Sequence, residues 1–233
     1  MKGIRIQNKC MSTKSYLKQE DKNYIQSAIE KRQEVVFSCN GLNHEEKEKF
    51  KEVLQVFLTE CKRENMFAYL SYCLLELLDN ANRANVKRIY FKKNNLDITN
   101  PSDYQKGMVG FKQAIINPEN VLQNLKSNEL TVKLLLSVND DILLQVSNNT
   151  KITEVELNRI NEKIEKTKNY TSLEDAVYDI DETEGCGLGL ISIILMLKKI
   201  SRNTKSLFFN LTENETVATI KIPTNNFTQL EEI

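Results

Sequence analysis

Apolar positions recur with a helical period in the middle of the chain and mark its central predicted element. Across residues 67–85 the apolar side chains follow the i, i+3, i+4, i+7 spacing of a helix that packs on a core. These side chains are Leu70, Leu74, Leu77, Ala81 and Ala84. Glu76, Asn80 and Arg83 repeat this spacing beside the apolar stripe. A carboxylate, a carboxamide and a guanidinium therefore lie along one edge of the predicted helix.

The polar edge of this helix has two interpretations. It suits a metal-bound polyphosphate, because a carboxylate polarises water, a carboxamide oxygen ligates Mg²⁺ and a guanidinium binds phosphate oxygens. It also suits an ordinary amphipathic helix whose polar edge is simply solvated. The helix alone does not decide between the two.

Periodicity and alternation predict most of the remaining elements. The predicted helices cover residues 18–32, 44–63, 153–166 and an apolar segment that opens at 185–190 and runs to 200. The predicted strands cover residues 34–39, 86–92, 132–138, 141–147, 206–211 and 217–222. Two of these strands flank Asn139-Asp140, which predicts a β-hairpin with a tight turn.

Residues 94–131 are harder to assign. Asn100-Pro101 predicts a helix start, because proline is favoured at the first helical position, and Asn117-Pro118 predicts a second one. We interpret the segment as a pair of helices on the surface.

Residues 167–184 are polar and have no strong period, so we predict a loop there. With the end of the preceding helix, residues 161–184 would form a mobile lid that closes on a ligand. The alternative is a permanently packed connection with a short helix around residues 173–177.

Charge and cysteine content exclude several classes of function. Lys and Arg number 32, as do Asp and Glu, so no net field directs the protein to nucleic acid or to an anionic membrane. The five cysteines have no CxxC spacing, so neither a disulfide framework nor a zinc site is indicated, and the single histidine excludes a histidine-based metal site. No apolar run is long enough to cross a bilayer. We expect a soluble cytoplasmic protein.

Three of the seven glycines, Gly185, Gly187 and Gly189, stand together before the last predicted helix. Without Cβ atoms the backbone approaches a phosphate closely, and the first N–H groups of the helix point at the anion. Glycines at such spacing also occur in tight turns and at closely packed helices, so the spacing alone is a weak signal for phosphate binding. A polar loop before them and an apolar helix after them strengthen it.

The order of these motifs resembles the GHKL ATPase superfamily, which includes gyrase, a heat-shock chaperone, histidine kinases and MutL. The resemblance covers residues 66–223, and residues 146–152 and 156–160 are most similar to the histidine-kinase branch. It implies an α/β two-layer sandwich of the Bergerat type, with a mixed, mostly antiparallel sheet and helices on one face. The implied domains are an N-terminal extension at 1–63, an ATP-binding domain at 64–225 with a helical insertion at about 94–131, and a tail at 226–233.

The resemblance also implies roles for single residues. Asn80 would bind Mg²⁺, Glu76 would act as catalytic base and Arg83 would contact the phosphates. Asn148 and Thr150 would form the adenine motif, and Thr216 would lie near the base. The phosphate-facing turn would comprise Gly185, Gly187, Leu188 and Gly189.

The adenine motif departs from the family pattern. The family has Asp-x-Gly-x-Gly, whereas this chain has Asn148-Asn149-Thr150-Lys151-Ile152. The amide oxygen of Asn148 still accepts a hydrogen bond, but a neutral acceptor is weaker than a carboxylate, and Thr150 and Ile152 crowd the base. We therefore expect adenine nucleotides to bind, but weakly.

The pair His44-Glu45 is similar to a phosphoacceptor motif, but only 36 positions separate His44 from Asn80. That leaves no room for the two long dimerising helices of a histidine kinase, so we expect a solvated histidine at a helix start.

The expected function is cytoplasmic signalling that uses ATP and Mg²⁺. The protein would transfer phosphate to a partner of the response-regulator or sigma/anti-sigma type, or hydrolyse ATP slowly. The alternative is a non-catalytic regulatory module that binds its partner with or without nucleotide. A second copy of the chain is a further candidate partner, whereas nucleic acid and membrane are not expected.

Overall fold

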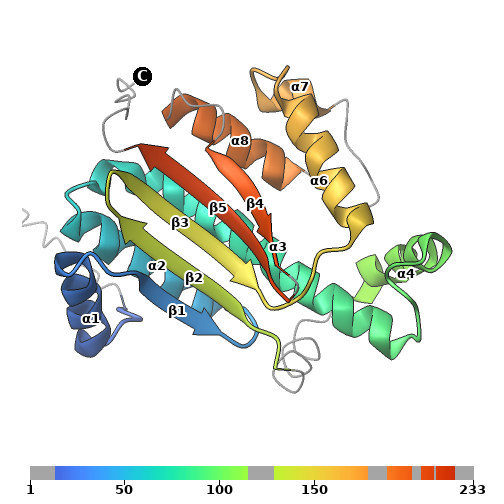
Figure 1. Ribbon diagram of the computed structural model, residues 1–233, viewed down its shortest axis with the longest axis horizontal. Coiled ribbons are helices and arrows are strands. Elements are labelled where there is room, and N and C mark those ends of the chain that lie inside the picture. The colour runs from blue at the N-terminus through green and yellow to red at the C-terminus, as the bar shows by residue number, and fades with distance from the viewer. Residues whose placement is uncertain (1–13, 115–128, 178–187, 201–205, 213, 224–233) are drawn as a thin grey trace, which may run out of the picture.

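A five-stranded antiparallel sheet, in the order β1-β2-β3-β5-β4, forms one layer of the structure (Figure 1). The structure is a computed structural model that describes residues 14–114, 129–177, 188–200, 206–212 and 214–223. The strands are β1 (Val35–Cys39), β2 (Val132–Val138), β3 (Asp141–Asn148), β4 (Leu207–Leu211) and β5 (Thr216–Pro223). All described pairings are antiparallel, which confirms the mostly antiparallel sheet that we expected, and the described strands form no parallel pair.

The predicted hairpin is confirmed as β2 and β3, which turn at Asn139-Asp140. Its register pairs Val138 with Ile142 near the turn and Val132 with Asn148 at the open end. Asn148 also lies opposite Thr216 of β5. The register of the sheet thus brings together two residues that are far apart in the sequence.

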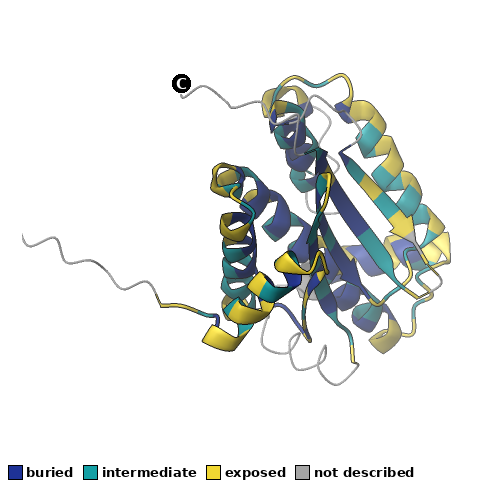
Figure 2. Cartoon of the chain, turned by 60° about the vertical axis from the view of Figure 1, so that its left-hand side comes forward, coloured by how far each residue is buried: buried dark blue, intermediate teal, exposed yellow. Residues whose placement is uncertain are grey.

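Helices cover one face of this sheet, as expected for a two-layer α/β sandwich (Figures 1 and 2). The helices over this face include α2 (His44–Glu60), α3 (Phe67–Lys93) and α8 (Leu188–Ile200). Burial alternates along β2 and β3, because successive strand residues point to opposite faces. The inward-facing residues join the main core, whose fully buried members include Phe57, Leu74, Leu134, Leu144 and Ile193.

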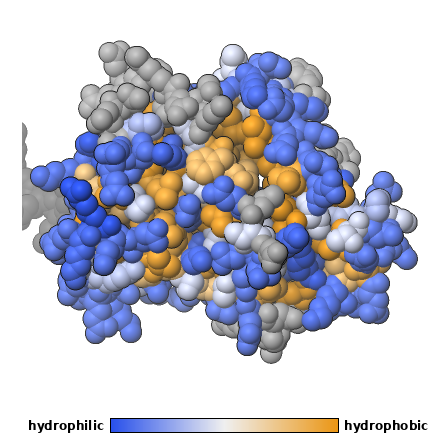
Figure 3. All heavy atoms as spheres, viewed as in Figure 1, coloured by the Kyte–Doolittle hydropathy of each residue, from blue (hydrophilic) through white to orange (hydrophobic). Residues whose placement is uncertain are grey.

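Among the described elements, no helix covers the other face of the sheet (Figure 1). Figure 3, which views this face, shows apolar side chains gathered over the sheet among hydrophilic residues. At outward-facing positions of the strands, Val36 and Phe208 are 39% and 37% exposed.

The first described residues belong to the same core. Helix α1 (Gln19–Glu30) places Ile25 and Ala28 in it, and β1 is the edge strand next to β2. The carboxylate of Glu52 accepts hydrogen bonds from the main-chain N–H groups of Tyr16 and Leu17 at 2.6 and 3.1 Å. The predicted elements at 18–32, 34–39 and 44–63 are therefore confirmed, with slightly different ends.

Helix α3 is longer than predicted, because it continues from residue 85 to Lys93. The predicted strand at 86–92 is wrong. Its apolar residues Val86, Ile89 and Phe91 pack against a neighbouring helix, α4 (Pro101–Ala114), in a second core cluster. Residues 86–91 therefore extend α3, although their sequence resembles a strand, because α4 packs against them. The sequence pattern does not reveal this neighbouring helix.

Helix α4 begins at the predicted proline, and Asn100 caps it by accepting hydrogen bonds from the main chain of Ser102 and Asp103. The second predicted start, at Asn117-Pro118, lies outside the described residues. The surface interpretation of this segment is wrong for α4, because Tyr104, Met108 and Phe111 are only 2%, 6% and 1% exposed.

Helix α6 (Glu154–Thr167) confirms the prediction at 153–166, and α7 (Leu173–Val177) follows it. Residues 161–166 thus belong to the helix as predicted, and Thr167, which we assigned to the loop, is its last residue. The alternative prediction of a short helix at 173–177 is confirmed, and Ala176 packs in a cluster with Ile191 and Leu195 of α8. Residues 178–184 of the predicted lid lie outside the described part of the chain. No described helix is long and apolar enough to cross a membrane.

Candidate functional site

A cavity of about 740 Å³ lies between α3, α4 and α6, and the ends of β3 and β5 and the start of α8 also line it. Most of the site residues that we predicted from the sequence line this cavity. They are Glu76, Asn80, Arg83, Asn148, Leu188, Gly189 and Thr216. Gly185 and Gly187 lie outside the described residues. Residues from four separate stretches of sequence thus meet around one cavity.

The start of α8 lies directly against α3. A Cβ atom added to Gly189 would collide with the carboxylate of Glu76 unless that side chain moved, so the main chain of α8 lies very close to the carboxylate. The first turn of an α-helix exposes unpaired N–H groups and a partial positive charge, which favour an anion. The contact therefore places an anion-attracting helix start beside the carboxylate.

Glu76 and Asn80 lie one helical turn apart on α3 and both line the cavity. Their carboxylate and carboxamide oxygens are the hard donors that Mg²⁺ prefers. Among the described residues no group of three or more His, Cys, Asp and Glu side chains could hold a metal ion. A metal at Asn80 would therefore take its other ligands from water and from a bound phosphate, which is the usual pattern for Mg²⁺.

Asn148 is held in a buried polar network at the end of β3. Its Nδ2 donates to Asn85 Oδ1 at 3.1 Å and to Thr150 Oγ1 at 2.5 Å, and Asn85 donates in turn to the carbonyl of Thr131. Because both amide hydrogens are used, the oxygen of Asn148 is the atom left to accept from a ligand. Thr216 Oγ1 donates to the carbonyl of Thr150 at 2.8 Å. Thr150 thus supports both residues from outside the cavity lining.

Cationic side chains outnumber carboxylates around the cavity. Five cationic and two anionic residues line it, namely Arg83, Lys87, Arg88, Arg159, Lys163, Glu76 and Glu156. Sequence analysis identified only Arg83 and Glu76 among these. Lys87 and Arg88 of α3 were missed because we predicted a strand at 86–92. A helix that continued through this segment would have placed Lys87 on the same edge as residues 76, 80 and 83. A cavity with this excess of positive charge favours an anionic ligand.

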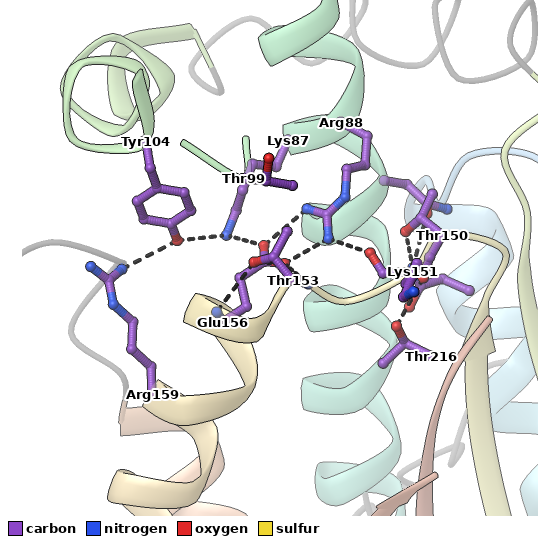
Figure 4. Close-up of polar contacts among 12 residues, drawn as sticks. Lys87, Arg88, Thr99, Tyr104, Thr150, Lys151, Thr153, Glu156, Arg159 and Thr216 are labelled. Carbon is purple, nitrogen blue, oxygen red and sulfur yellow. Dashed lines mark hydrogen bonds and ion pairs between the residues drawn. The ribbon is translucent and has the colours of Figure 1, made fainter. Parts of the chain in front are cut away.

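Glu156 joins α6 to α3 at one end of the cavity (Figure 4). Its Oε1 lies 2.9 Å from Lys87 Nζ and 2.9 Å from Arg88 Nη1, and its Oε2 lies 2.6 Å from Arg88 Nη2. Burial alone raises the pKa of this carboxyl group. The hydrogen bonds from Arg88 and the positive charges of Lys87 and Arg88 outweigh that effect and lower the pKa to about 2. The carboxylate therefore stays ionised at neutral pH.

Tyr104 connects α4 to the same group of residues (Figure 4). Its hydroxyl accepts hydrogen bonds from Lys87 Nζ at 3.4 Å and from Arg159 Nη1 at 3.2 Å. The Arg159 guanidinium also lies 4.9 Å from the centre of the Tyr104 ring, in cation–π geometry. Three helices thus meet beside the cavity through charged and aromatic side chains.

The remaining candidates lie away from this site. His44 is exposed at the first position of α2, where the side chain of Asn43 caps the helix. Among the cysteines that the structure describes, Cys39, Cys61 and Cys73 are free thiols, and burial raises the pKa of Cys39 and Cys73 to about 12. These thiols are therefore protonated at neutral pH and poorly reactive.

Comparison with known proteins gives little functional information. The chain is similar to an uncharacterized protein of Treponema pallidum (strain Nichols), with 38% identity over 160 residues that cover 67% of this chain and 31% of that protein. The chain thus spans less than a third of the length of this relative. No protein-family model matches the chain, and no solved structure matches it. Support for a function therefore comes from the geometry of the site.

Proposed function

We propose that the cavity binds an adenine nucleotide with Mg²⁺ and that the protein is an ATP-binding signalling module of the cytoplasm. One observation carries the proposal: a single cavity combines oxygen donors for a metal, a closely approaching helix start and an excess of cationic side chains. A metal-bound polyphosphate uses all three features.

The phosphates fit the end of the cavity formed by α3 and the start of α8. Asn80 would hold Mg²⁺, and the bound ion would neutralise charge on the phosphate oxygens. Arg83 lies on the next turn of α3 and contacts the phosphates, while Gly189 lets the main chain of α8 approach them. In a transfer reaction, Glu76 accepts the proton of the attacking hydroxyl group.

The base fits the side of the cavity formed by β3 and β5. The oxygen of Asn148 accepts a hydrogen bond from the exocyclic amine, and apolar side chains beside it contact the base. Among these are Val146, Ile152 and Ala218, which all line the cavity. The neutral amide gives a weaker bond than a carboxylate, so the affinity for the base is low.

A thermal melt with Mg-ATP tests the binding proposal. A ligand that binds the folded state raises stability by RT ln(1 + [L]/Kd), so millimolar Mg-ATP should raise the melting temperature of the wild type. Asn80→Ala should abolish the part of the shift that depends on Mg²⁺. Asp79→Ala is the matched control, because Asp79 does not line the cavity and its 2.6 Å ion pair with Lys47 lies at the surface. A wild type that shows no shift contradicts the proposal.

The bound nucleotide has two candidate uses. In the first, its γ-phosphoryl group passes to a protein partner of the response-regulator or sigma/anti-sigma type, or to water. In the second, the nucleotide only regulates the binding of that partner. Measuring ADP formation with and without Glu76→Gln separates them. ADP that forms with the wild type and not with the variant supports the first use.

A further inference from the structure

Helix α6 forms the wall of the cavity that faces α3. Arg159, Ile160 and Lys163 all project from α6 into the cavity lining. Their positions relative to α3 therefore depend on how α6 is attached to it. In the first turn of α6 the attachment to α3 runs through Glu156, whereas the far end of α6 is bonded to α8 by Lys198, whose Nζ donates to the carbonyl of Thr167 at 2.7 Å.

The carboxylate of Glu156 makes two kinds of contact at once. Within its own helix it completes a capping box, in which it accepts from the main chain and hydroxyl of Thr153 at 2.9 and 3.0 Å. Across the cavity end it binds Lys87 and Arg88 of α3. With the residue only 7% exposed, this double use fixes the start of α6 to one place on α3.

Helix α4 makes the junction rigid from the other side. A Cβ atom on Gly107 would collide with the ring of Phe91, so α4 lies very close to α3. From this position Tyr104 binds both Lys87 and Arg159, and Met108 completes the apolar part of the cavity wall. The segment that holds Glu156 is therefore supported on both sides.

We propose that Glu156 is a positioning residue of the ligand site, which ties α6 to α3 through Lys87 and Arg88 so that Arg159 and Lys163 face the anionic groups of the ligand. The proposal rests on the proposed function, since it concerns the same cavity. Glu156 itself does not touch the ligand's phosphates, because its negative charge would repel them.

Glu156→Gln separates positioning from simple electrostatics, because the two predict changes of opposite sign. Removing a negative charge near the cavity should tighten the binding of an anion, whereas releasing α6 should weaken it. Glutamine also replaces glutamate in a capping box, so the start of α6 is kept. We expect the Kd for Mg-ATP to rise about tenfold. Binding as tight as, or tighter than, that of the wild type overturns the proposal.

Two further variants separate the tie to α3 from the capping of α6. Arg88→Met removes the hydrogen bonds of Arg88 to both carboxylate oxygens but leaves Glu156 paired with Lys87, so it should fold even if Glu156→Gln does not. Its Kd for Mg-ATP should rise about tenfold. Because Arg88 also lines the cavity, its lost positive charge weakens anion binding too, so the rise supports positioning only if the amides of α6 exchange faster in the same variant. Thr153→Ala breaks the capping box but keeps the tie to α3, so its Kd should stay within about twofold of the wild type. If Thr153→Ala weakens binding as much as Arg88→Met, the capping of α6 rather than the tie controls the affinity and the proposal is wrong.

Hydrogen exchange without nucleotide keeps this proposal separable from the proposed function. In Glu156→Gln and Arg88→Met, the amides of α6 should exchange at least about tenfold faster, while those of α2 in the main core keep their rates. If the wild type does not bind Mg-ATP, the proposed function fails but this measurement still decides whether the tie positions α6. Unchanged protection of α6 in both variants overturns the positioning role.

Discussion

The two parts of α3 lie in different surroundings although they form one helix. The inner part, residues 67–85, packs under the sheet with an apolar stripe of regular spacing, including Leu70, Leu74 and Leu77. The outer part, residues 86–93, packs on α4 and also buries the charged residue Lys87. The inner part is held by the main core, whereas the outer part is held by a local cluster of aromatic and ionic contacts. A side chain's contribution to stability should therefore depend on which part carries it.

Truncating a core side chain in each part should give the largest difference. Leu74→Ala removes a fully buried leucine from the main core and should lower the free energy of unfolding by about 3 to 4 kcal/mol. Ile89→Ala, in the outer part, should lower it by only about 2 kcal/mol, because the small cluster beside the cavity can relax into the space. Urea denaturation measures both. Equal losses would mean that the outer cluster is as tightly packed as the core.

Acid should weaken the ion pairs that join α6 to the outer part of α3. The pKa of Glu156 is about 2, below its ordinary value of 4.5, so the ion cluster contributes stability that is fully present above pH 4.5 and is lost as the pH falls to about 2. By linkage this contribution is about 3 kcal/mol. The difference in unfolding free energy between the wild type and Glu156→Gln should therefore shrink over that range. A difference that stays constant with pH contradicts the role of the ion pairs.

The contact between α4 and the outer part can be tested with two glycines of the same helix. A Cβ atom at Gly107 meets the buried ring of Phe91, whereas one at Gly110 meets the terminal hydroxyl of Tyr90, which is only partly buried and can move. Gly107→Ala should therefore lower the free energy of unfolding by about 1 to 2 kcal/mol. Gly110→Ala should be nearly neutral, because the higher helix propensity of alanine offsets the small displacement. Similar values for the two variants would show that α4 adjusts freely.

Asn148→Asp tests the boundary between the two parts, where Asn85 of α3 meets β3. A carboxylate is a stronger acceptor for the adenine amine, so it should tighten Mg-ATP binding by about 1 kcal/mol. It cannot donate to Asn85 and Thr150 as the amide does, so the ligand-free protein should lose about 1 kcal/mol of stability or more. Calorimetric titration and denaturation measure the two effects. Binding that is unchanged or weaker would show that the base does not contact this residue.

Prediction from the sequence succeeded best where one local pattern specified both a secondary-structure element and the element that pairs with it. The hairpin of β2 and β3 is specified by alternation on both sides of Asn139-Asp140, so its register needs no distant information. The edge formed by Glu76, Asn80 and Arg83 was equally readable, because residues three and four apart share one face of a helix. The structure places these three side chains around one cavity, while their chemical roles remain predictions.

The end of the cavity that contains Arg88 and Glu156 could not be predicted from the sequence and depends on tertiary structure. Val86 to Phe91 has the composition of a strand and became helix because α4 packs against it, and the sequence does not say that α4 would be there. The bond between Arg88 and Glu156 joins residues 68 positions apart, and no local period links them. A buried ion pair forms only where the fold brings both charges out of water together. The sequence by itself therefore determined the elements and the polar edge of α3, whereas the packing of α3, α4 and α6 determined which charges the cavity contains.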